Sequence, residues 1–313
     1  MKRLCFLVIC MSIIMGCSTS TSSTKALVDY VDPNIGTAHC RWFFYTPAAI
    51  PFGMAKLAPS TDAHLGNPGG WQAVGYDFRH TSIEGFANFH EFQVGGVVFA
   101  PTVGELQTVP GELENPDGGY RSRFDKKDEV AAPGYYSVLL KDYGVKAELT
   151  AMKRVGFHRY TYPKTELANL IFDIGNKQGE SGEVKDAEVQ YFEDGRVEGY
   201  VITSPVYVNI YQKGADVRMY FSAVLNKKPV QVGTFVKDVV NPGKHQEKGP
   251  GAGLYMTFST EEQEAVEVKV GLSYTSIENA RFNRETEAAD VTFDQAKKNA
   301  TDVWNESLSR IYV

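Results

Sequence analysis

A histidine and a glutamate, His90 and Glu91, stand side by side in the segment TSIEGFANFHEFQVGG, which covers residues 81–96. Residues of these two types are common general acids and bases in enzymes. The segment also has the pattern of a β-strand, in which successive side chains point to opposite faces of the sheet. In a strand, His90 and Glu91 would point away from each other and would not act as a pair. The residues therefore fit either the wall of a binding site or a strand with two adjacent polar residues.

Aromatic residues beside glycines form a second candidate site, suited to a sugar. Trp71 follows Gly70 in NPGGWQAVGYD, on a loop that can bring the indole face to the surface. An aromatic face suits the C–H-rich side of a pyranose, and nearby polar groups can bond its hydroxyls. Gly36 in DPNIGT can present backbone groups to the same pocket, and His39 and Trp42 are further candidates. The structural alternative is a tryptophan packed on the body of the protein and a glycine that serves a turn.

Composition argues against several classes of function. None of the six histidines is two or four residues from another, so the sequence predicts no histidine metal site. Cys40 is the only thiol after Cys17, which excludes an internal disulfide in the exported chain. Without Lys2 and Arg3 the net charge goes from −6 to −8, against electrostatic binding of nucleic acid.

Alternating hydrophobic residues indicate the elements that must position these side chains. Valines and leucines recur at every second position in GYYSVLL and EAVEVKVGLSY, and clusters of Gly, Pro, Asn and Asp separate such runs. This pattern predicts an all-β fold, a large antiparallel β-sandwich over residues 29–290. Residues 291–313 have helical spacing and predict an amphipathic helix. That helix either lies back on the sandwich or leads into a second domain, and we favour the second reading.

The first residues have the form of an export signal. Lys2 and Arg3 precede a short apolar run that ends in Ile14-Met15-Gly16-Cys17, too short for a membrane span and suited to a signal peptide. The final four residues resemble a bacterial lipobox, so we expect residues 1–16 to be removed and Cys17 to carry lipid. Residues 17–28 then form a Ser/Thr-rich tether. We expect an exported protein that a lipid anchors in the outer membrane. An ordinary signal peptide with a chance cysteine is the alternative.

An ordered set of motifs resembles the N-terminal module of glycoside hydrolase family 92. The motifs are YVDPNIGT, PAAIPFGMAKLAPSTDA, GGWQAVGYDFRHTSIEGF, PTVGEL and APGYYSVLLKDYGVKAELTAMKRVGFHRYTYP. The resemblance implies a β-sandwich of the galactose-mutarotase type, a super-sandwich, with a C-terminal linker helix. It also implies a calcium-dependent exo-α-mannosidase that acts on mannose-containing glycans. In that family a second, (α/α)6 barrel domain carries the catalytic acid and base and most of the calcium ligands.

The resemblance implies that the catalytic acid and base lie in a second domain and not in residues 1–313. We therefore expect no catalytic residue and no cofactor of this chain's own, and a barrel domain supplied in cis or by an adjacent reading frame. An autonomous site would need two carboxyl groups ~6.5–9.5 Å apart, and Asp62, Asp77, Glu84 and Glu91 are the candidates. Turn binding and strand capping are the alternative roles of these four side chains. We therefore predict that the chain alone is inactive.

Two further readings remain open. The chain could be a stand-alone surface lipoprotein that binds glycans without cleaving them, or a remnant with no function. Better-known family members carry a GFSHTHLSG-like segment where this sequence reads GFANFHEFQVGG. His90 keeps its place, whereas Glu91 is new. If this segment lines the substrate site, we expect a sugar specificity that differs from the α-1,2-mannosidase pattern.

Overall fold

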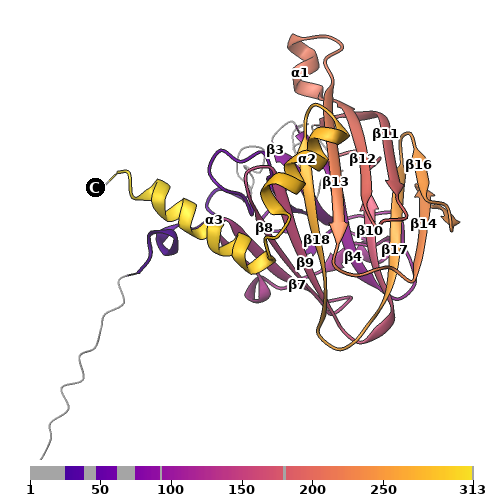
Figure 1. Cartoon of the computed structure of the whole chain (residues 1–313), viewed down its shortest axis with the longest axis horizontal. Coiled ribbons are helices and arrows are strands. Elements are labelled where there is room, and N and C mark those ends of the chain that lie inside the picture. Colours follow the sequence, from indigo (N-terminus) through magenta and orange to yellow (C-terminus); the bar gives the residue numbers. More distant parts are fainter. Residues whose placement is uncertain (1–24, 39–46, 62–74, 92–93, 179–180, 312–313) are drawn as a thin grey trace, which may run out of the picture.

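The structure is a computed structural model. It describes residues 25–38, 47–61, 75–91, 94–178 and 181–311, and all structural statements below refer to these ranges. β-Strand is the main secondary structure of the described chain, and most strands belong to two large antiparallel sheets (Figure 1).

The first large sheet has seven strands in the described chain, in the order β1-β3-β4-β10-β17-β14-β15. All neighbouring strands in it are antiparallel. Its strands are β1 (Ala58–Ser60), β3 (Gly85–Glu91), β4 (Val94–Val103), β10 (Thr165–Asp173), β14 (Gln231–Val236), β15 (Val239–Pro242) and β17 (Ala252–Thr260).

The second large sheet has nine strands in the same described ranges, in the order β16-β11-β12-β13-β18-β9-β8-β7-β6. Its strands are β6 (Val130–Ala132), β7 (Tyr135–Leu140), β8 (Val145–Ala151), β9 (Val155–Tyr162), β11 (Glu183–Tyr191), β12 (Val197–Ser204), β13 (Val217–Leu225), β16 (Gln246–Lys248) and β18 (Glu264–Ser273). A small sheet joins β2 (Ser82–Ile83) to β5 (Ser122–Arg123). Short 3-10 helices occur at η1 (Leu27–Tyr30), η2 (Pro116–Gly118) and η3 (Lys126–Asp128).

The core lies between the two large sheets. Phe172 of the seven-stranded sheet packs against Phe221 of the nine-stranded sheet, with ring centroids 6.3 Å apart. Phe86 meets Tyr160 in the same way, at 6.0 Å. Burial of such aromatic and branched side chains is the main driving force for folding. The predicted β-sandwich is therefore confirmed, and the alternating residues of β7 and β18 lie in this core as expected.

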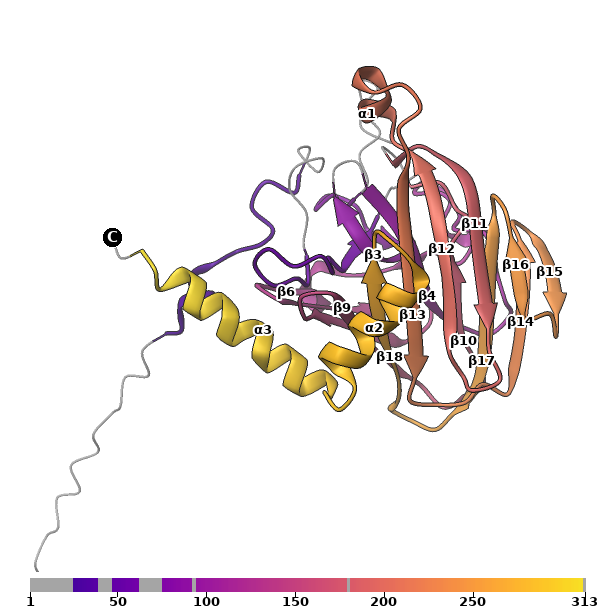
Figure 2. The same ribbon diagram turned by 45° about the horizontal axis from the view of Figure 1, so that its top comes forward.

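Two described helices were not expected from the sequence. Helix α2 (Ile277–Ala288) lies on the outer face of the nine-stranded sheet, against β13 and β18 (Figure 2). Its buried residues include Asn283 and Arg284, so its sequence lacks a clear apolar stripe. Helix α1 (Val206–Tyr211) stands at the tip of the β12–β13 connection. The apolar run VYVNIY, rich in β-branched residues that favour strands, is thus a short helix between two strands.

The predicted C-terminal helix is α3 (Phe293–Leu308). Thr292 caps it, with its side-chain oxygen accepting the backbone N–H of Gln295 at 3.2 Å. Phe293 and Ala296 pack with residues of the nine-stranded sheet, while the other end of α3 extends beyond the sandwich beside η1 (Figure 1). There Trp304 Nε1 donates a hydrogen bond to the Ala49 carbonyl at 2.7 Å.

Helix α3 thus lies partly on the sandwich and partly beyond it. The sequence left open whether it lies back or leads into another domain, and the contacts at its first turns favour the former for that part. Its role as a linker into a second domain, and the division of the chain at residue 290, stay predictions. None of the described helices combines the length and the apolar character that a membrane span requires.

Candidate functional site

The segment that carries His90 and Glu91 is strand β3, which pairs with β1 and β4. Asn88 faces the opposite sheet, where its Oδ1 lies 2.8 Å from His158 Nε2. His90 is fully buried at the end of the strand, whereas the Glu91 side chain is 40% exposed. The expectation that this segment is a strand is therefore confirmed.

A hollow of about 230 Å³ opens at the end of β3, and we call it the β3 hollow. Phe52 lies at its rim with its side chain 98% exposed and with a left-handed backbone, φ 59°. A left-handed conformation is unfavourable for a bulky residue and is often found at functional sites. Tyr274, which stacks on Phe89 with centroids 5.0 Å apart, lines the same hollow. The residues lining the β3 hollow are Phe52, Gly53, Met54, Lys56, His90, Glu91 and Tyr274.

The polar groups of the β3 hollow are a charged pair and a neutral ring. Lys56 and Glu91 form an ion pair. Burial lowers the pKa of His90 to about 3, and the nearby Lys56 ammonium acts in the same direction, so the imidazole is uncharged at neutral pH. The hollow can stack a ring on an aromatic side chain and hydrogen-bond hydroxyl groups. His90 is buried, whereas Glu91 is partly exposed and pairs with Lys56. This agrees with the opposite faces that strand alternation predicts, although both residues border the hollow.

A second hollow, the turn hollow, lies beside the segment DPNIGT and measures about 440 Å³. The turn is held by its own side chains, since Asp32 Oδ1 accepts the Asn34 N–H at 2.9 Å. Gly36 has φ 84°, a left-handed conformation that glycine adopts without strain. The residues lining the turn hollow are Asp32, Asn34, Ile35, Gly36, Ala38 and Phe78.

The predicted site residues thus fall into two hollows rather than one. Gly36 lines the turn hollow, and His90 and Glu91 line the β3 hollow. Trp42, Gly70 and Trp71, with His39, lie outside the described residues. The sequence did not identify Phe52 and Phe78 as site residues. Each lies within one of the quoted motifs, Phe52 before a glycine and Phe78 between two charged residues, and this was the only local sign of their role.

The described carboxylates that could serve as acid or base are held in ion pairs. Burial opposes the charge of Asp77, but hydrogen bonds from Arg79 outweigh it and lower its pKa to about 2. Glu84 is buried against Arg121, with Oε2 and Nη2 3.1 Å apart. Glu91 pairs with Lys56, and Asp62 lies outside the described residues. These contacts favour the structural role that the sequence left as the alternative.

Beside Glu84 a buried acid, Asp173, accepts a hydrogen bond from Tyr120 at 2.7 Å. Burial raises the pKa of Asp173 to about 7. A raised folded-state pKa means that the folded protein keeps a proton that the unfolded chain releases between about pH 4 and pH 7. The contribution of Asp173 to stability is therefore complete below its ordinary pKa and is lost as the pH rises through 7.

We predict that Asp173→Asn flattens the stability profile between pH 4 and pH 7 and stabilises the protein at pH 8 by ~1–3 kcal/mol. The amide stays neutral at every pH and its carbonyl can still accept from Tyr120. Urea unfolding at several pH values measures this, with the exposed Asp238→Asn as the matched control. Parallel pH profiles for wild type and Asp173→Asn would contradict the assignment.

Comparison with known proteins decides what the sandwich is. The model of the glycosyl hydrolase family 92 N-terminal domain matches residues 30–273. The chain belongs to glycoside hydrolase family 92. No curated protein matches the chain.

Solved structures of family 92 share this fold. A family 92 α-mannosidase from Bacteroides thetaiotaomicron is 29% identical, with a TM-score of 0.80 over 91% of this chain and 38% of its own. The same enzyme in complex with mannoimidazole gives a TM-score of 0.81. A family 92 inverting mannosidase from Bacteroides thetaiotaomicron, 21% identical with a TM-score of 0.74, shows the same fold. The chain thus spans about 37–38% of the length of these family 92 proteins.

Family 92 membership raised the expectation of calcium, which the sequence reading assigned mainly to a second domain. Within the described ranges, no three His, Cys, Asp or Glu residues gather as a metal site would require. The assignment of calcium mainly to a second domain stays a prediction.

Proposed function

We propose that this chain is the N-terminal, carbohydrate-contacting part of an α-mannosidase-like enzyme. Its reaction is the inverting hydrolysis of α-mannosidic bonds in glycans, with the acid and base supplied by an (α/α)6 domain. The family match over residues 30–273 carries this proposal. The 29% identity to an enzyme named as an α-mannosidase supports the substrate class.

The ion-paired carboxylates support placing the chemistry elsewhere. Inverting hydrolysis needs one protonated and one ionised carboxyl group ~6.5–9.5 Å apart, with room for water between them. Each of the three described candidates instead forms an ion pair with a basic side chain: Asp77 with Arg79, Glu84 with Arg121 and Glu91 with Lys56. In the proposed enzyme Asp77 and Glu84 stabilise the scaffold, Glu91 contributes to binding rather than to proton transfer, and calcium is bound mainly by the (α/α)6 domain.

The β3 hollow is the part of this chain that we assign to the sugar. Phe52 offers an open aromatic face, which suits the apolar side of a pyranose. The Lys56–Glu91 pair supplies donors and acceptors for hydroxyl groups at the same rim. The β3 hollow would bind and orient the sugar. We propose that Trp71, Gly70 and Trp42 contribute to the same substrate site.

The chain alone is predicted to release no mannose from α-1,2-mannobiose, because we assign the catalytic acid and base to the (α/α)6 domain. The purified 313-residue chain is incubated with the disaccharide, and free mannose is measured by anion-exchange chromatography. A complete family 92 α-mannosidase serves as the positive control. Release by the chain above the blank, abolished in Glu91→Gln, would contradict the assignment of the acid and base to another domain.

We also propose that the protein is exported and anchored in the outer membrane through lipid on Cys17. The lipobox-like sequence ahead of Cys17 supports this, and Cys17 itself lies outside the described residues. Metabolic labelling with palmitate followed by membrane fractionation tests the anchor. Unlabelled protein in the soluble fraction would argue for an ordinary signal peptide, and a Cys17→Ala variant that stays in the membrane fraction would contradict an anchor through Cys17.

A further inference from the structure

Phe78 is an exposed aromatic residue at the wall of the turn hollow. Its side chain is 41% exposed, and its ring borders the same space as Gly36 and Asn34. Its backbone N–H donates to the Thr37 carbonyl at 3.3 Å, which joins the two segments that form the hollow. An aromatic face, an open glycine and a turn rich in backbone acceptors thus meet in a space of about 440 Å³.

A lysine ammonium lies against the Phe78 ring. Lys126 Nζ is 4.6 Å from the Phe78 ring centroid and 4.5 Å from the centroids of Tyr76 and Phe124. Tyr76 and Phe124 are 0% and 4% exposed, so two of the three rings are fixed in the body of the protein. A cation close to aromatic faces is attracted by the quadrupoles of the rings.

Hydrogen bonds to the core fix the position of this ammonium. Lys126 Nζ donates to Glu129 Oε2 at 3.1 Å. Tyr76 and Tyr136 donate to the two oxygens of Glu129 at 2.8 and 2.7 Å. The Glu129 side chain is 2% exposed, and Tyr136 lies in the sandwich core. The exposed ring of Phe78 thus contacts an ammonium group that is hydrogen-bonded to buried residues of the core.

We propose that Phe78 is the stacking platform of a hexopyranose subsite in the turn hollow, and that Lys126 is the residue that positions it. The volume of the hollow is within the range of small-molecule sites. Gly36 leaves the backbone open to hydroxyl groups, and a fixed ring loses little conformational entropy when a sugar stacks on it. This inference rests on the proposed carbohydrate function and adds a second sugar-binding position to that of the β3 hollow.

Titration of sugars against the full chain tests this subsite. The probes are α-1,2-mannobiose and a panel of methyl hexopyranosides, and binding is measured by saturation-transfer NMR and calorimetry. We expect Phe78→Ala to weaken binding at least tenfold. Lys126→Met, which keeps the aliphatic stem, should weaken it three- to tenfold, and Lys126→Arg, which restores a cation, should return it to within twofold of wild type. Phe282→Ala, exposed on α2, is the matched control and should bind like wild type.

Each outcome separates the subsite from the proposed function. Binding of mannosides that is unchanged in Phe78→Ala overturns the subsite and leaves the proposed function standing. Binding of another hexopyranose but not mannosides, lost in Phe78→Ala, supports the subsite and overturns the mannoside assignment. If Lys126→Met weakens sugar binding and Lys126→Arg does not restore it, the positioning role of Lys126 is overturned. The same holds if the loss of binding in Lys126→Met is accompanied by a matching fall in melting temperature, since the effect is then on stability. Absence of binding to every probe overturns both.

Discussion

Replacing Glu84 by alanine is expected to lower the free energy of unfolding by ~3–5 kcal/mol. Glu84 and Arg121 form an ion pair with side chains only 2% and 1% exposed, so the substitution leaves an uncompensated buried guanidinium group. Ser60 Oγ also loses its acceptor, which lies at 2.8 Å. Breaking one member of a buried pair is more damaging than replacing both, because the desolvated partner charge stays behind.

Urea unfolding of the Glu84→Ala variant measures this loss. Glu84→Met/Arg121→Met, which removes both charges, should be less destabilised than Glu84→Ala. Glu114→Ala at an exposed position is the matched control, with a change within ~0.5 kcal/mol. A loss below ~1 kcal/mol for Glu84→Ala would contradict the ion pair. Arg121 also donates to the Thr61 carbonyl at 2.5 Å, a contact that stays available in Glu84→Ala but does not neutralise the guanidinium charge.

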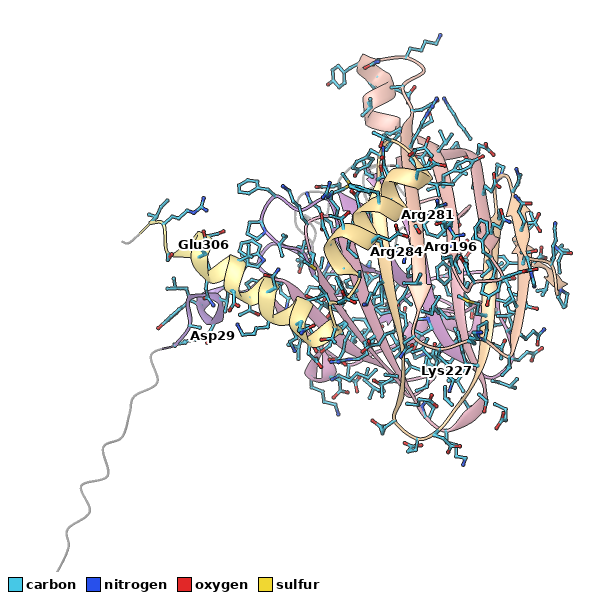
Figure 3. The ribbon with its side chains drawn as sticks, viewed as in Figure 1. Asp29, Arg196, Lys227, Arg281, Arg284 and Glu306 are labelled. Atoms are coloured by element: carbon cyan, nitrogen blue, oxygen red, sulfur yellow. The ribbon has the colours of Figure 1, made fainter. Side chains whose placement is uncertain are left out.

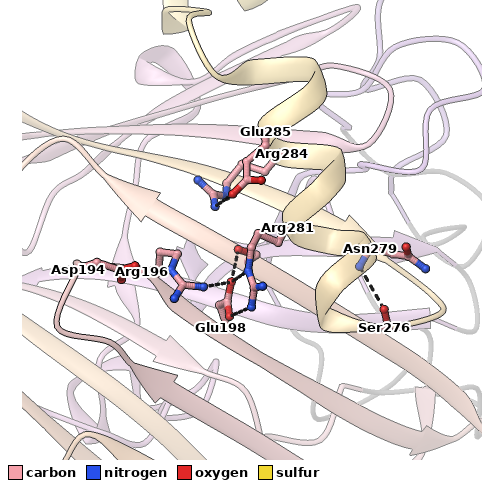
Figure 4. Close-up of polar contacts among 9 residues, drawn as sticks. Asp194, Arg196, Glu198, Ser276, Asn279, Arg281, Arg284 and Glu285 are labelled. Carbon is pink, nitrogen blue, oxygen red and sulfur yellow. Dashed lines mark hydrogen bonds and ion pairs between the residues drawn. The ribbon is translucent and has the colours of Figure 1, made fainter.

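Glu198→Ala is expected to be the second most damaging change, with a loss of ~2–3 kcal/mol. Glu198 has a 2% exposed side chain on β12 and accepts two hydrogen bonds from Arg281 of α2, at 2.7 and 2.6 Å (Figure 4). Arg196 donates to it at 3.0 Å and Ser222 at 2.7 Å. The loss is smaller than for Glu84 because the two guanidinium groups are 24% and 34% exposed and can be hydrated.

The Glu198 cluster fastens α2 to the nine-stranded sheet, so Glu198→Ala should also expose α2 to amide exchange. Figure 3 shows Arg196, Arg281 and Arg284 together at this face of the sheet. Burial opposes ionisation of Glu198, but hydrogen bonds from Arg281 and Ser222 outweigh it and lower its pKa. A lowered folded-state pKa gives stability that is present above the ordinary pKa and is lost as the pH falls through the folded value.

Thermal unfolding at pH 7 and at pH 3 measures this effect. The difference between wild type and Glu198→Ala should shrink at pH 3, and Arg281→Lys should keep part of the interaction. Equal stability of wild type and Glu198→Ala at pH 7, or unchanged exchange of α2 amides, would contradict the fastening role.

Much of the fold could be predicted because burial follows local periodicity. In β18, Val266, Val268, Val270 and Leu272 are all buried, as their spacing of two requires. Helix α3 has apolar residues at helical spacing and its capping residue Thr292 is visible in the sequence. Helix α2 could not be predicted in this way, because it is held to the sheet by the ion pair of Arg281 with Glu198 of β12, which no local pattern reveals.

The site was predicted less completely because its residues come from distant parts of the chain. Phe52, Glu91 and Tyr274 share the β3 hollow, although up to 222 positions separate them, counting from 52 to 274. Alternation predicted opposite faces for His90 and Glu91, but it carries no information on which distant residues meet at the end of the strand. Likewise, only the fold brings Lys126 against Phe78.

The central claim is that this sandwich works with an (α/α)6 domain to hydrolyse α-mannosides. The most direct measurement is to produce the chain together with the coding sequence that follows Val313, or the adjacent reading frame, and to follow α-1,2-mannobiose and other α-mannobiosides by proton NMR. We predict that the combined protein releases mannose, first as the β-anomer, that removal of calcium abolishes the release, and that the chain alone is inactive. The account would be contradicted if the combined protein released no mannose from any linkage, or if the chain alone released it at the same rate.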